Sequence, residues 1–327
     1  MISPASTAVR SSAAPASLVV AIVGDVHDQW SEADAQALHR LAVDFVLFVG
    51  DFGNEAVALV RQIAAIDLPK AVILGNHDAW YSATPWGQKK CPYNRQQEDW
   101  VTQQLQALGN CHVGYGHLDL PQFGLSVVGG RPFSWGGSDW TNAPFYAERY
   151  GVHSFEESVA RLCQTVEATR YNDLIFIGHC GPQGLGDQPE APCGRDWKPL
   201  GGDFGDPDLT AAIAYAKRRG KAVPLVAFGH MHHTLRHRKD QLRRQIHWDT
   251  ATCYLNAARV PRWRQQEGRT QRHFALVTLR DNQVAQARQV WVDDQRGIIH
   301  SVDLVDQTTG DGDLDLPLAL SSGPTLR

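Results

Sequence analysis

The sequence predicts an α/β fold, and two observations along the first 80 residues predict it. Short apolar runs alternate with amphipathic segments, and the polar residues that follow the runs recur at intervals of about 25 residues, as in a βαβ unit. The runs are continuously apolar, which is typical of parallel strands that are covered on both faces. Parallel strands end at a common edge of a sheet, so these polar residues are expected to gather where α/β proteins bind ligands.

The strands expected in this first unit are Leu18–Val23, Phe45–Val49 and Ala71–Leu74. Amphipathic helices are expected between them, at residues 31–42 and 55–65. Ser31 is the candidate N-cap of the first helix, because its hydroxyl can accept a hydrogen bond from a free backbone N–H of the first turn.

Helices and strands alternate again further along the chain. In order, the pattern predicts a helix at 94–108, a strand at Leu125–Val128, a helix at Phe155–Ala168, a strand at Leu174–Ile177, a helix at Leu209–Arg219 and a strand at Leu225–Phe228. Residues 242–293 hold strand-like runs, including 273–279 and 288–292, without a helical pattern. This last region predicts a second, largely antiparallel sheet.

A single domain is expected over residues 18–305. Residues 1–17 are rich in Ala, Ser and Pro, and residues 306–327 are acidic with Gly, Thr and Ser, so both segments are expected to be disordered tails. The leading segment shares its Ser content and its lack of acidic residues with transit peptides, so a plastid location is the alternative to a cytoplasmic one.

Charge and cysteine content exclude several classes of protein. The chain contains 31 Lys and Arg residues and 35 Asp and Glu residues, which gives a net charge of −4. A dedicated nucleic-acid binder would instead carry an excess of basic residues. The apolar run Leu18–Val23 is far shorter than the ~20 residues of a membrane span, so no membrane partner is expected. Six cysteines without a C-x-x-C pair are typical of reduced thiols in a cytoplasmic protein.

Five predicted strands are each followed by polar residues of one chemical kind. These are Asp25-Val26-His27, Gly50-Asp51, Gly75-Asn76-His77-Asp78, Gly178-His179 and Gly229-His230-Met231-His232. Each motif alone has a structural explanation, such as a helix N-cap for Gly-Asp or a turn for Asn-His-Asp. All five occur at the same kind of place, which favours a joint site.

The residue types of these motifs favour transition metals. Carboxylates, imidazoles and one amide oxygen form a mixed oxygen and nitrogen set, which suits Mn, Fe, Zn or Co better than Ca or an oxygen-bound Mg. Seven such groups suit two divalent ions that share one carboxylate. Two ions ~3.5–4 Å apart stabilise the attacking and leaving oxygens of a phosphoryl displacement.

The ordered series D-x-H, G-D, G-N-H-D, G-H and G-H-x-H resembles the calcineurin-like metallophosphoesterase superfamily, over residues 18 to about 295. The resemblance implies a four-layer α/β/β/α sandwich, with two stacked mixed β-sheets flanked by helices. It implies that Asp51 bridges two metal ions. It also implies that the other metal ligands form two sets: Asp25, His27 and His232 for the first ion, and Asn76, His179 and His230 for the second.

The same resemblance gives His77 and Asp78 catalytic roles. It implies that His77 acts as general acid or hydrogen-bond donor at the scissile phosphate and that Asp78 orients it. A hydroxide that bridges the metals would attack phosphorus, which agrees with the absence of a Walker loop and of a nucleophilic serine elbow. A histidine suits the leaving group because its pKa lies near neutral pH.

The chain departs from the phosphoprotein phosphatases of this superfamily, which carry an arginine shortly after the bridging aspartate. Here the first arginine after Asp51 is Arg61. Arg131 and Arg195, both on Gly-rich loops, are the candidate substrate-binding residues, with a loop-bracing salt bridge as the alternative for each. The loop 180–206 also resembles a subgroup found in cyanobacteria and plant plastids, which names no substrate.

Two further segments leave alternatives open. The Trp-rich stretch 80–140 is consistent either with an apolar lid over a ring-bearing substrate or with ordinary loop packing. The basic run Arg236-His237-Arg238-Lys239 either attracts an anionic substrate or forms a solvated hairpin.

The sequence therefore predicts a dinuclear metal-dependent phosphoesterase that acts on a small phosphorylated molecule. The alternatives within enzymes are a nucleotide pyrophosphatase and a cyclic-nucleotide phosphodiesterase, which use the same groups. The alternative from another class is a metal-binding interaction module without catalysis. No feature of the sequence indicates an oligomeric state or the identity of the metal, although manganese is among the expected ions.

Overall fold

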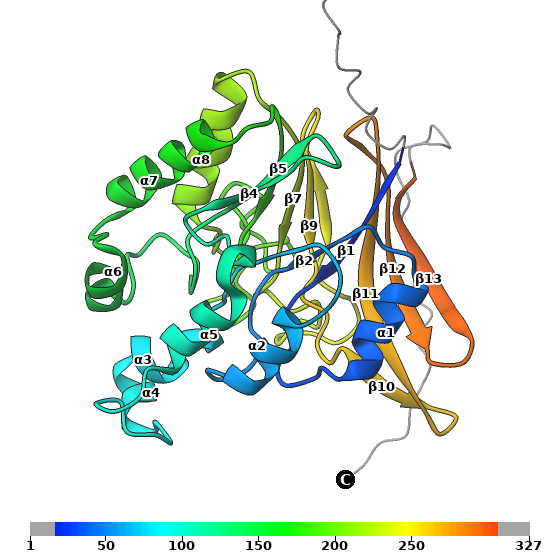
Figure 1. Ribbon diagram of the computed structural model, residues 1–327, viewed down its shortest axis with the longest axis horizontal. Helices are drawn as coiled ribbons and strands as arrows, with labels where there is room; N and C mark the ends of the chain where they lie inside the picture. The colour runs from blue at the N-terminus through cyan, green and yellow to red at the C-terminus, as the bar shows by residue number, and fades with distance from the viewer. Residues whose placement is uncertain (1–16, 307–327) are drawn as a thin grey trace, which may run out of the picture.

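Two β-sheets packed face to face, with helices on both outer sides, form the architecture of the computed structural model (Figure 1). The structure describes residues 17–306. Each sheet contains parallel and antiparallel pairs, so the predicted α/β sandwich of two mixed sheets flanked by helices is confirmed. The tails predicted at 1–17 and 306–327 lie, except for residues 17 and 306, outside the described residues.

The first sheet contains the N-terminal βαβ units and the C-terminal strands. Its order is β13 (Gly297–Asp306), β12 (Gln283–Asp293), β11 (Arg269–Arg280), β1 (Leu18–Val23), β2 (Phe45–Phe48) and β3 (Lys70–Val72), with β10 (Trp263–Gln266) paired to β11. β1, β2 and β3 are parallel, whereas β1 and β11 are antiparallel. The intervening helices are α1 (Glu32–Arg40), with Ser31 at the N-cap as predicted, and α2 (Val57–Ala64).

The second sheet is built from the middle of the chain. Its order is β4 (His117–Leu120), β5 (Leu125–Gly129), β6 (Asp173–Ile177), β7 (Ala222–Phe228), β9 (Cys253–Asn256) and β8 (Ile246–Trp248). Helices α7 (Phe155–Ala168) and α8 (Pro207–Arg218) pack side by side against this sheet, at the upper left of Figure 1.

The remaining helical elements lie between β3 and β4, which belong to different sheets, and between β5 and α7. They are η1 (His77–Ala79), α3 (Trp80–Ala83), α4 (Pro85–Lys89), α5 (Trp100–Leu108), η2 (Gly109–Cys111) and α6 (Ala143–Tyr150). None of the helices in the described part of the chain has the length and apolar content that a bilayer crossing requires.

The prediction of a separate antiparallel sheet over residues 242–293 is wrong. β8 and β9 extend the second sheet, and β9 runs parallel to β7. β10, β11 and β12 extend the first sheet through the antiparallel pairing of β11 with β1. Both sheets recruit strands from this region because each has an edge strand whose backbone N–H and C=O groups need partners.

Three apolar cores separate the four layers. The middle core lies between the sheets and contains side chains from both, among them Ile22, Leu47 and Ile175. Alternate residues of the first-sheet strands, such as Val46 and Phe48, face the other way and pack under the adjacent helices. Because both faces of each sheet are covered, the loops at the strand ends are the places left for a binding site.

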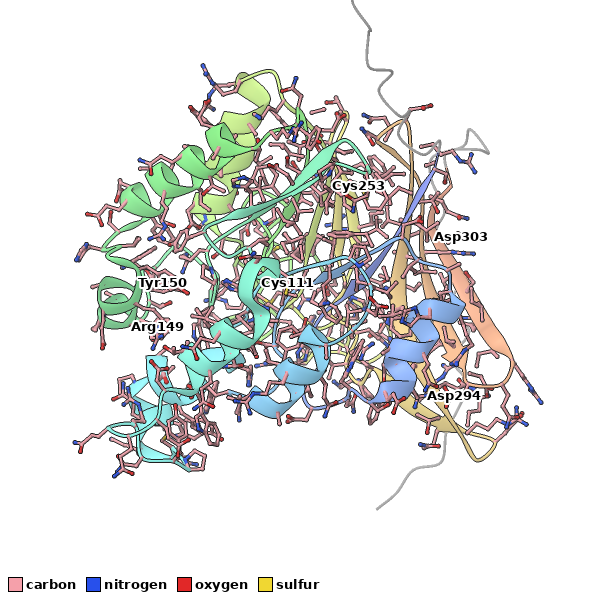
Figure 2. All side chains as sticks on the ribbon, viewed as in Figure 1. Cys111, Arg149, Tyr150, Cys253, Asp294 and Asp303 are labelled. Atoms are coloured by element: carbon pink, nitrogen blue, oxygen red, sulfur yellow. The ribbon has the colours of Figure 1, made fainter. Side chains whose placement is uncertain are left out.

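Helix α1 is fixed to the first sheet by a buried carboxylate. Asp34 is fully buried and lies 3.2 Å from the Arg272 guanidinium and 3.5 Å from that of Arg262. It also accepts a hydrogen bond from the Trp263 indole at 3.1 Å. Asp294, labelled beside α1 in Figure 2, accepts a second bond from Arg272 at the surface end of this cluster.

We expect Asp34→Ala to lower the free energy of unfolding by about 3–5 kcal/mol, because two buried guanidinium groups lose their shared counter-charge. Urea unfolding followed by circular dichroism measures this change. The control is Glu167→Ala, which removes an exposed ion pair with Arg219 and is expected to change stability far less, because solvent screens exposed charges. An equally small effect of both substitutions would contradict the assigned role of Asp34.

Candidate metal centre

The polar residues that follow five strands converge at one edge of the two sheets. Asp25 follows β1, Asp51 follows β2, Asn76 follows β3, His179 follows β6 and His230 follows β7. Backbone hydrogen bonds hold the adjacent strand ends together, including Asp25 N–H to Gly50 O at 3.1 Å and Gly229 N–H to His179 O at 2.8 Å. The site is therefore assembled from both sheets at once.

Four of the converging residues have left-handed backbone conformations. Asp25, His27, Asp51 and His230 have φ angles of 49°, 43°, 55° and 67°. Residues other than glycine rarely adopt this region, and aspartate and histidine are among those that tolerate it best. Such strain persists only where the surrounding structure enforces it, and it is concentrated at functional sites.

Glycines beside these residues allow the side chains to approach the backbone closely. A Cβ atom on Gly75 would lie 2.6 Å from His179 Nδ1 and 2.6 Å from the Asp51 nitrogen. A Cβ atom on Gly50 would lie 2.8 Å from the same imidazole nitrogen, and Gly50 itself has a φ of 93°. Any larger residue at either position would displace His179 or Asp51.

The first group of side chains consists of Asp25, His27 and His232. His232 Nε2 lies 3.4 Å from Asp25 Oδ1 and 3.1 Å from His27 Nε2. His27 Nε2 lies 3.9 Å from Asp25 Oδ1 and equally far from Asp51 Oδ2. The carboxylate of Asp25 also accepts the backbone N–H of His230, which fixes its direction.

The second group consists of Asp51, His179 and His230, with Asn76 beside them. His179 Nε2 lies 3.2 Å from Asp51 Oδ1, 2.9 Å from Asn76 Oδ1 and 3.2 Å from His230 Nδ1. Asp51 belongs to this group through Oδ1 and approaches His27 of the first group through Oδ2. The two oxygens of one carboxylate thus face the two groups.

These separations fit divalent cations. Two atoms held about 2.1 Å from one ion lie about 3.0 Å apart at a right angle and about 3.4 Å apart at a tetrahedral angle. Five of the quoted donor-atom separations, from 2.9 to 3.4 Å, lie close to this range, whereas His27 Nε2 and Asp25 Oδ1 are 3.9 Å apart. His179 also donates its Nδ1–H to the Val49 carbonyl at 2.9 Å, which leaves Nε2 available as a ligand.

The protonation states of the site suit cation binding. Burial opposes ionisation of Asp51, but the nearby His179 outweighs it and holds the pKa of that carboxyl far below its usual range. Burial lowers the pKa of His230 to about 3, so its imidazole is neutral at physiological pH. Burial disfavours the protonated form of His179, but the negative charge of Asp51 raises the pKa of this histidine to about 9. A cation bound at the site would therefore displace the proton of His179.

His77 lies beside both groups. One of its ring nitrogens is within 4.8 Å of ligand atoms of His27 and Asp51. Its Nδ1 is 2.6 Å from Asn54 Oδ1, and its ring stacks on Trp80 at 4.7 Å with an interplanar angle of 11°. Burial lowers its pKa. Stacking on Trp80 therefore fixes the plane of the His77 ring, and the contact with Asn54 Oδ1 fixes the rotation of the ring within that plane.

The prediction that Asp78 orients His77 is wrong for this structure. The Asp78 carboxylate is fully buried and accepts the backbone N–H groups of Asp51, Phe52 and Gly75 at 3.0, 3.0 and 2.7 Å. These bonds join it to the backbone of two turns rather than to the imidazole. Asn54 instead contacts the His77 ring, and its place three residues after Asp51 was the only sequence signal for it.

The prediction that Arg131 binds substrate is also wrong. Arg131 is 1% exposed and forms ion pairs with Asp206 at 2.7 Å and Asp208 at 2.9 Å. It braces two loops, which is the alternative that the sequence left open. Arg195, in contrast, lines a cleft next to His230 and His232, and its role in substrate binding stays a prediction.

The chain matches a known protein family. A family model described as calcineurin-like phosphoesterase matches residues 18–234. Among curated proteins, none has a sequence that matches the chain.

Several solved structures are similar at low identity. TT1561 of Thermus thermophilus is 12% identical, with a TM-score of 0.46 over 80% of this chain and 93% of that one. A dimetal phosphatase from Danio rerio is 12% identical, with a TM-score of 0.43 over 88% and 98%. Purple acid phosphatase PPD1 from yellow lupin is 14% identical, with a TM-score of 0.44 over 88% and 53%.

We expect Asp51→Asn to remove most of the bound metal, because the substitution takes away the negative charge that faces both groups. Elemental analysis by mass spectrometry after loading with Mn²⁺ or Zn²⁺ measures the ions per chain. The control is His77→Ala, which is expected to retain the metal of the unaltered protein. Full metal content in Asp51→Asn would contradict the assignment of Asp51.

Proposed function

The chain belongs to the calcineurin-like phosphoesterase family, and from that premise we propose that it is a dinuclear metal-dependent phosphoesterase acting on a small phosphorylated molecule. One observation carries the proposal: two clusters of metal-ligand side chains face opposite oxygens of Asp51, with His77 beside both. The donor set contains carboxylates, imidazoles and an amide oxygen, which supports Mn, Fe, Zn or Co as the ions.

Each side chain of the centre has a distinct part in the proposed mechanism. Asp25, His27 and His232 would hold one cation, Asn76, His179 and His230 the other, and Asp51 both. When bound, two such ions supply positive charge for the phosphoryl oxygens and a water molecule of lowered pKa as nucleophile. The protein keeps the ligand atoms in place through the buried strand ends, so little rearrangement is needed when a phosphate binds.

His77 supplies the proton that the leaving oxygen needs. Asn54 Oδ1 accepts the Nδ1–H, so the opposite nitrogen is the one that exchanges a proton with the substrate. The pKa of His77 is lowered, mainly by burial, which makes its imidazolium form a stronger acid toward the leaving oxygen. Trp80 keeps the ring plane fixed by stacking and excludes water from one face.

Two other functions use the same atoms. A nucleotide pyrophosphatase and a cyclic-nucleotide phosphodiesterase would differ only in the groups that hold the rest of the substrate. A metal-binding module without catalysis would need neither the His77 imidazole nor its two-sided support by Asn54 and Trp80. The presence of that support favours an enzyme.

We also propose a cytoplasmic location. All six cysteines are free, which is typical of a reducing compartment. The alternative to a cytoplasmic location is a plastid location, which would follow if the chain belongs to the cyanobacterial and plant-plastid subgroup. N-terminal sequencing of the mature protein decides between them, because a plastid protein would lack the first residues.

His77→Ala is expected to lower kcat for an aryl phosphate or aryl phosphodiester by about 10²–10⁴-fold, because the leaving oxygen loses its proton donor. Metal content is expected to stay unchanged. Steady-state assays with Mn²⁺, Fe²⁺, Zn²⁺ and Co²⁺ measure this effect. Wild-type turnover no faster than that of Asp51→Asn, across aryl and alkyl phosphates, would contradict the proposed activity.

Asn54→Ala tests the positioning of His77. We expect kcat to fall while KM changes little, and the basic limb of the pH–rate profile to move to lower pH, because the imidazolium that donates the proton loses the acceptor of its Nδ1–H. Asn54→Asp restores an acceptor and is expected to recover part of the rate. A uniform loss of stability with an unshifted pH profile would instead indicate a purely structural residue.

A further inference from the structure

A cleft of about 710 Å³ opens directly beside the candidate metal centre. His230 and His232 form part of its wall. Most of the remaining wall comes from three segments that are distant in the chain: residues 135–142, residues 195–204 and the residues that follow His232. The volume falls within the ~300–1,000 Å³ that is typical of small-molecule sites.

Aromatic side chains line this cleft and connect it to His77. Trp135, Trp197 and Phe204 contribute to the wall, and the last two pack edge to face at 4.9 Å. Trp135 stacks on Trp80 at 5.5 Å, and Trp80 stacks on His77. The aromatic surface therefore runs without interruption from the proposed proton donor into the cleft.

Two arginines in the cleft have no carboxylate partner among residues 17–306. Arg195 donates through Nε to the Gly201 carbonyl at 2.8 Å and lies over the Phe204 ring at 5.3 Å. Arg236 lies over the Trp197 ring at 5.4 Å. Both guanidinium groups are positioned by aromatic faces while their terminal nitrogens remain available to an anion.

The other charged groups of the cleft are differently placed. Arg243 is buried, pairs with Asp196 at 3.3 Å and donates to several backbone carbonyls, so it serves the loop itself. Asp203 accepts the backbone N–H groups of Gly184 and Gly205. Asp139 is the remaining carboxylate of the wall. Arg195 and Arg236 are therefore the groups that can neutralise a second anionic group of a ligand.

We propose that the substrate is a nucleotide carrying at least two phosphoryl groups, a proposal that rests on the phosphoesterase function above. The terminal phosphoryl group would lie at the metal centre, the second phosphoryl group at Arg195 and Arg236, and the base against the Trp135, Trp197 and Phe204 faces. A sugar monophosphate would place only C–H groups on these aromatic faces and would have no second phosphoryl group for Arg195 and Arg236.

The reaction that follows is hydrolysis of the terminal phosphoryl group. A water oxygen forms a bond to the terminal phosphorus, and the bond from that phosphorus to the bridging oxygen breaks. The electron pair of the broken bond stays on the bridging oxygen, which takes a proton from His77, and the proton lost by water restores His77. The products are inorganic phosphate and the nucleotide shortened by one phosphoryl group.

Steady-state kinetics with adenosine diphosphate, ribose 5-phosphate and p-nitrophenyl phosphate tests the substrate class. We expect kcat/KM to be highest for adenosine diphosphate and at least about ten-fold lower for ribose 5-phosphate, since stacking and the second phosphoryl contact are both lost. Arg195→Ala and Arg236→Ala should each lower kcat/KM for adenosine diphosphate at least about ten-fold and affect p-nitrophenyl phosphate less. The matched control is Arg219→Ala, an exposed arginine paired with Glu167 on the far α8 surface.

Binding to the metal-free protein provides a readout that does not depend on activity. Adenosine monophosphate, the expected product, should change the tryptophan fluorescence of the metal-free chain in a saturable way. Trp197→Leu and Arg195→Ala should weaken that binding, whereas Arg219→Ala should not.

The outcomes separate the two proposals. The nucleotide proposal would be overturned if kcat/KM were equal for adenosine diphosphate and ribose 5-phosphate and adenosine monophosphate did not bind. In that case, turnover of p-nitrophenyl phosphate that depends on Asp51 would still support the phosphoesterase function. Absence of turnover for every substrate would overturn the phosphoesterase itself. Cleft-dependent binding of adenosine monophosphate in that case would support nucleotide recognition without hydrolysis.

Discussion

The buried carboxylate of Asp78 is the interaction on which the centre depends. It accepts backbone N–H groups from Asp51, Phe52 and Gly75, and so joins the turn after β2 to the turn after β3. Burial and the nearby charge of Asp51 raise its pKa well above the usual range. Asp51 is in turn fixed by the His77 backbone N–H, which donates to its Oδ1. The shared carboxylate and the proposed proton donor are therefore positioned by one small hydrogen-bonded unit.

Backbone strain and close packing extend this unit to the second sheet. The left-handed turns at Asp25, Asp51 and His230 aim side chains across the gap between the sheets, where His179 packs against the backbone at Gly50 and Gly75. A side chain at either glycine would displace His179 or Asp51. The four-layer fold matters to function because its middle core keeps the two strand edges in register.

Local patterns predicted the elements but not all of their partners. The bounds of α7 and β1 and the N-cap Ser31 followed from periodicity and capping chemistry, whereas β3 ends two residues before the predicted Leu74. The division of residues 242–293 between two sheets depends on the pairing of β11 with β1 across most of the chain, which no local pattern encodes. The partner of Arg131 was hidden for the same reason, because Asp206 lies on a distant loop. Asp78 was predicted to orient His77 because it is adjacent in sequence, whereas in the structure Asn54, from the preceding turn, contacts the His77 ring.

The central claim is that one carboxylate, Asp51, joins two cation sites. An anomalous-difference map from a crystal of the Mn²⁺- or Zn²⁺-loaded protein tests it most directly. The account predicts two peaks about 3.5–4 Å apart, one among Asp25, His27 and His232, the other among Asn76, His179 and His230, with Asp51 between them. A single peak, or peaks that do not contact Asp51, would contradict it.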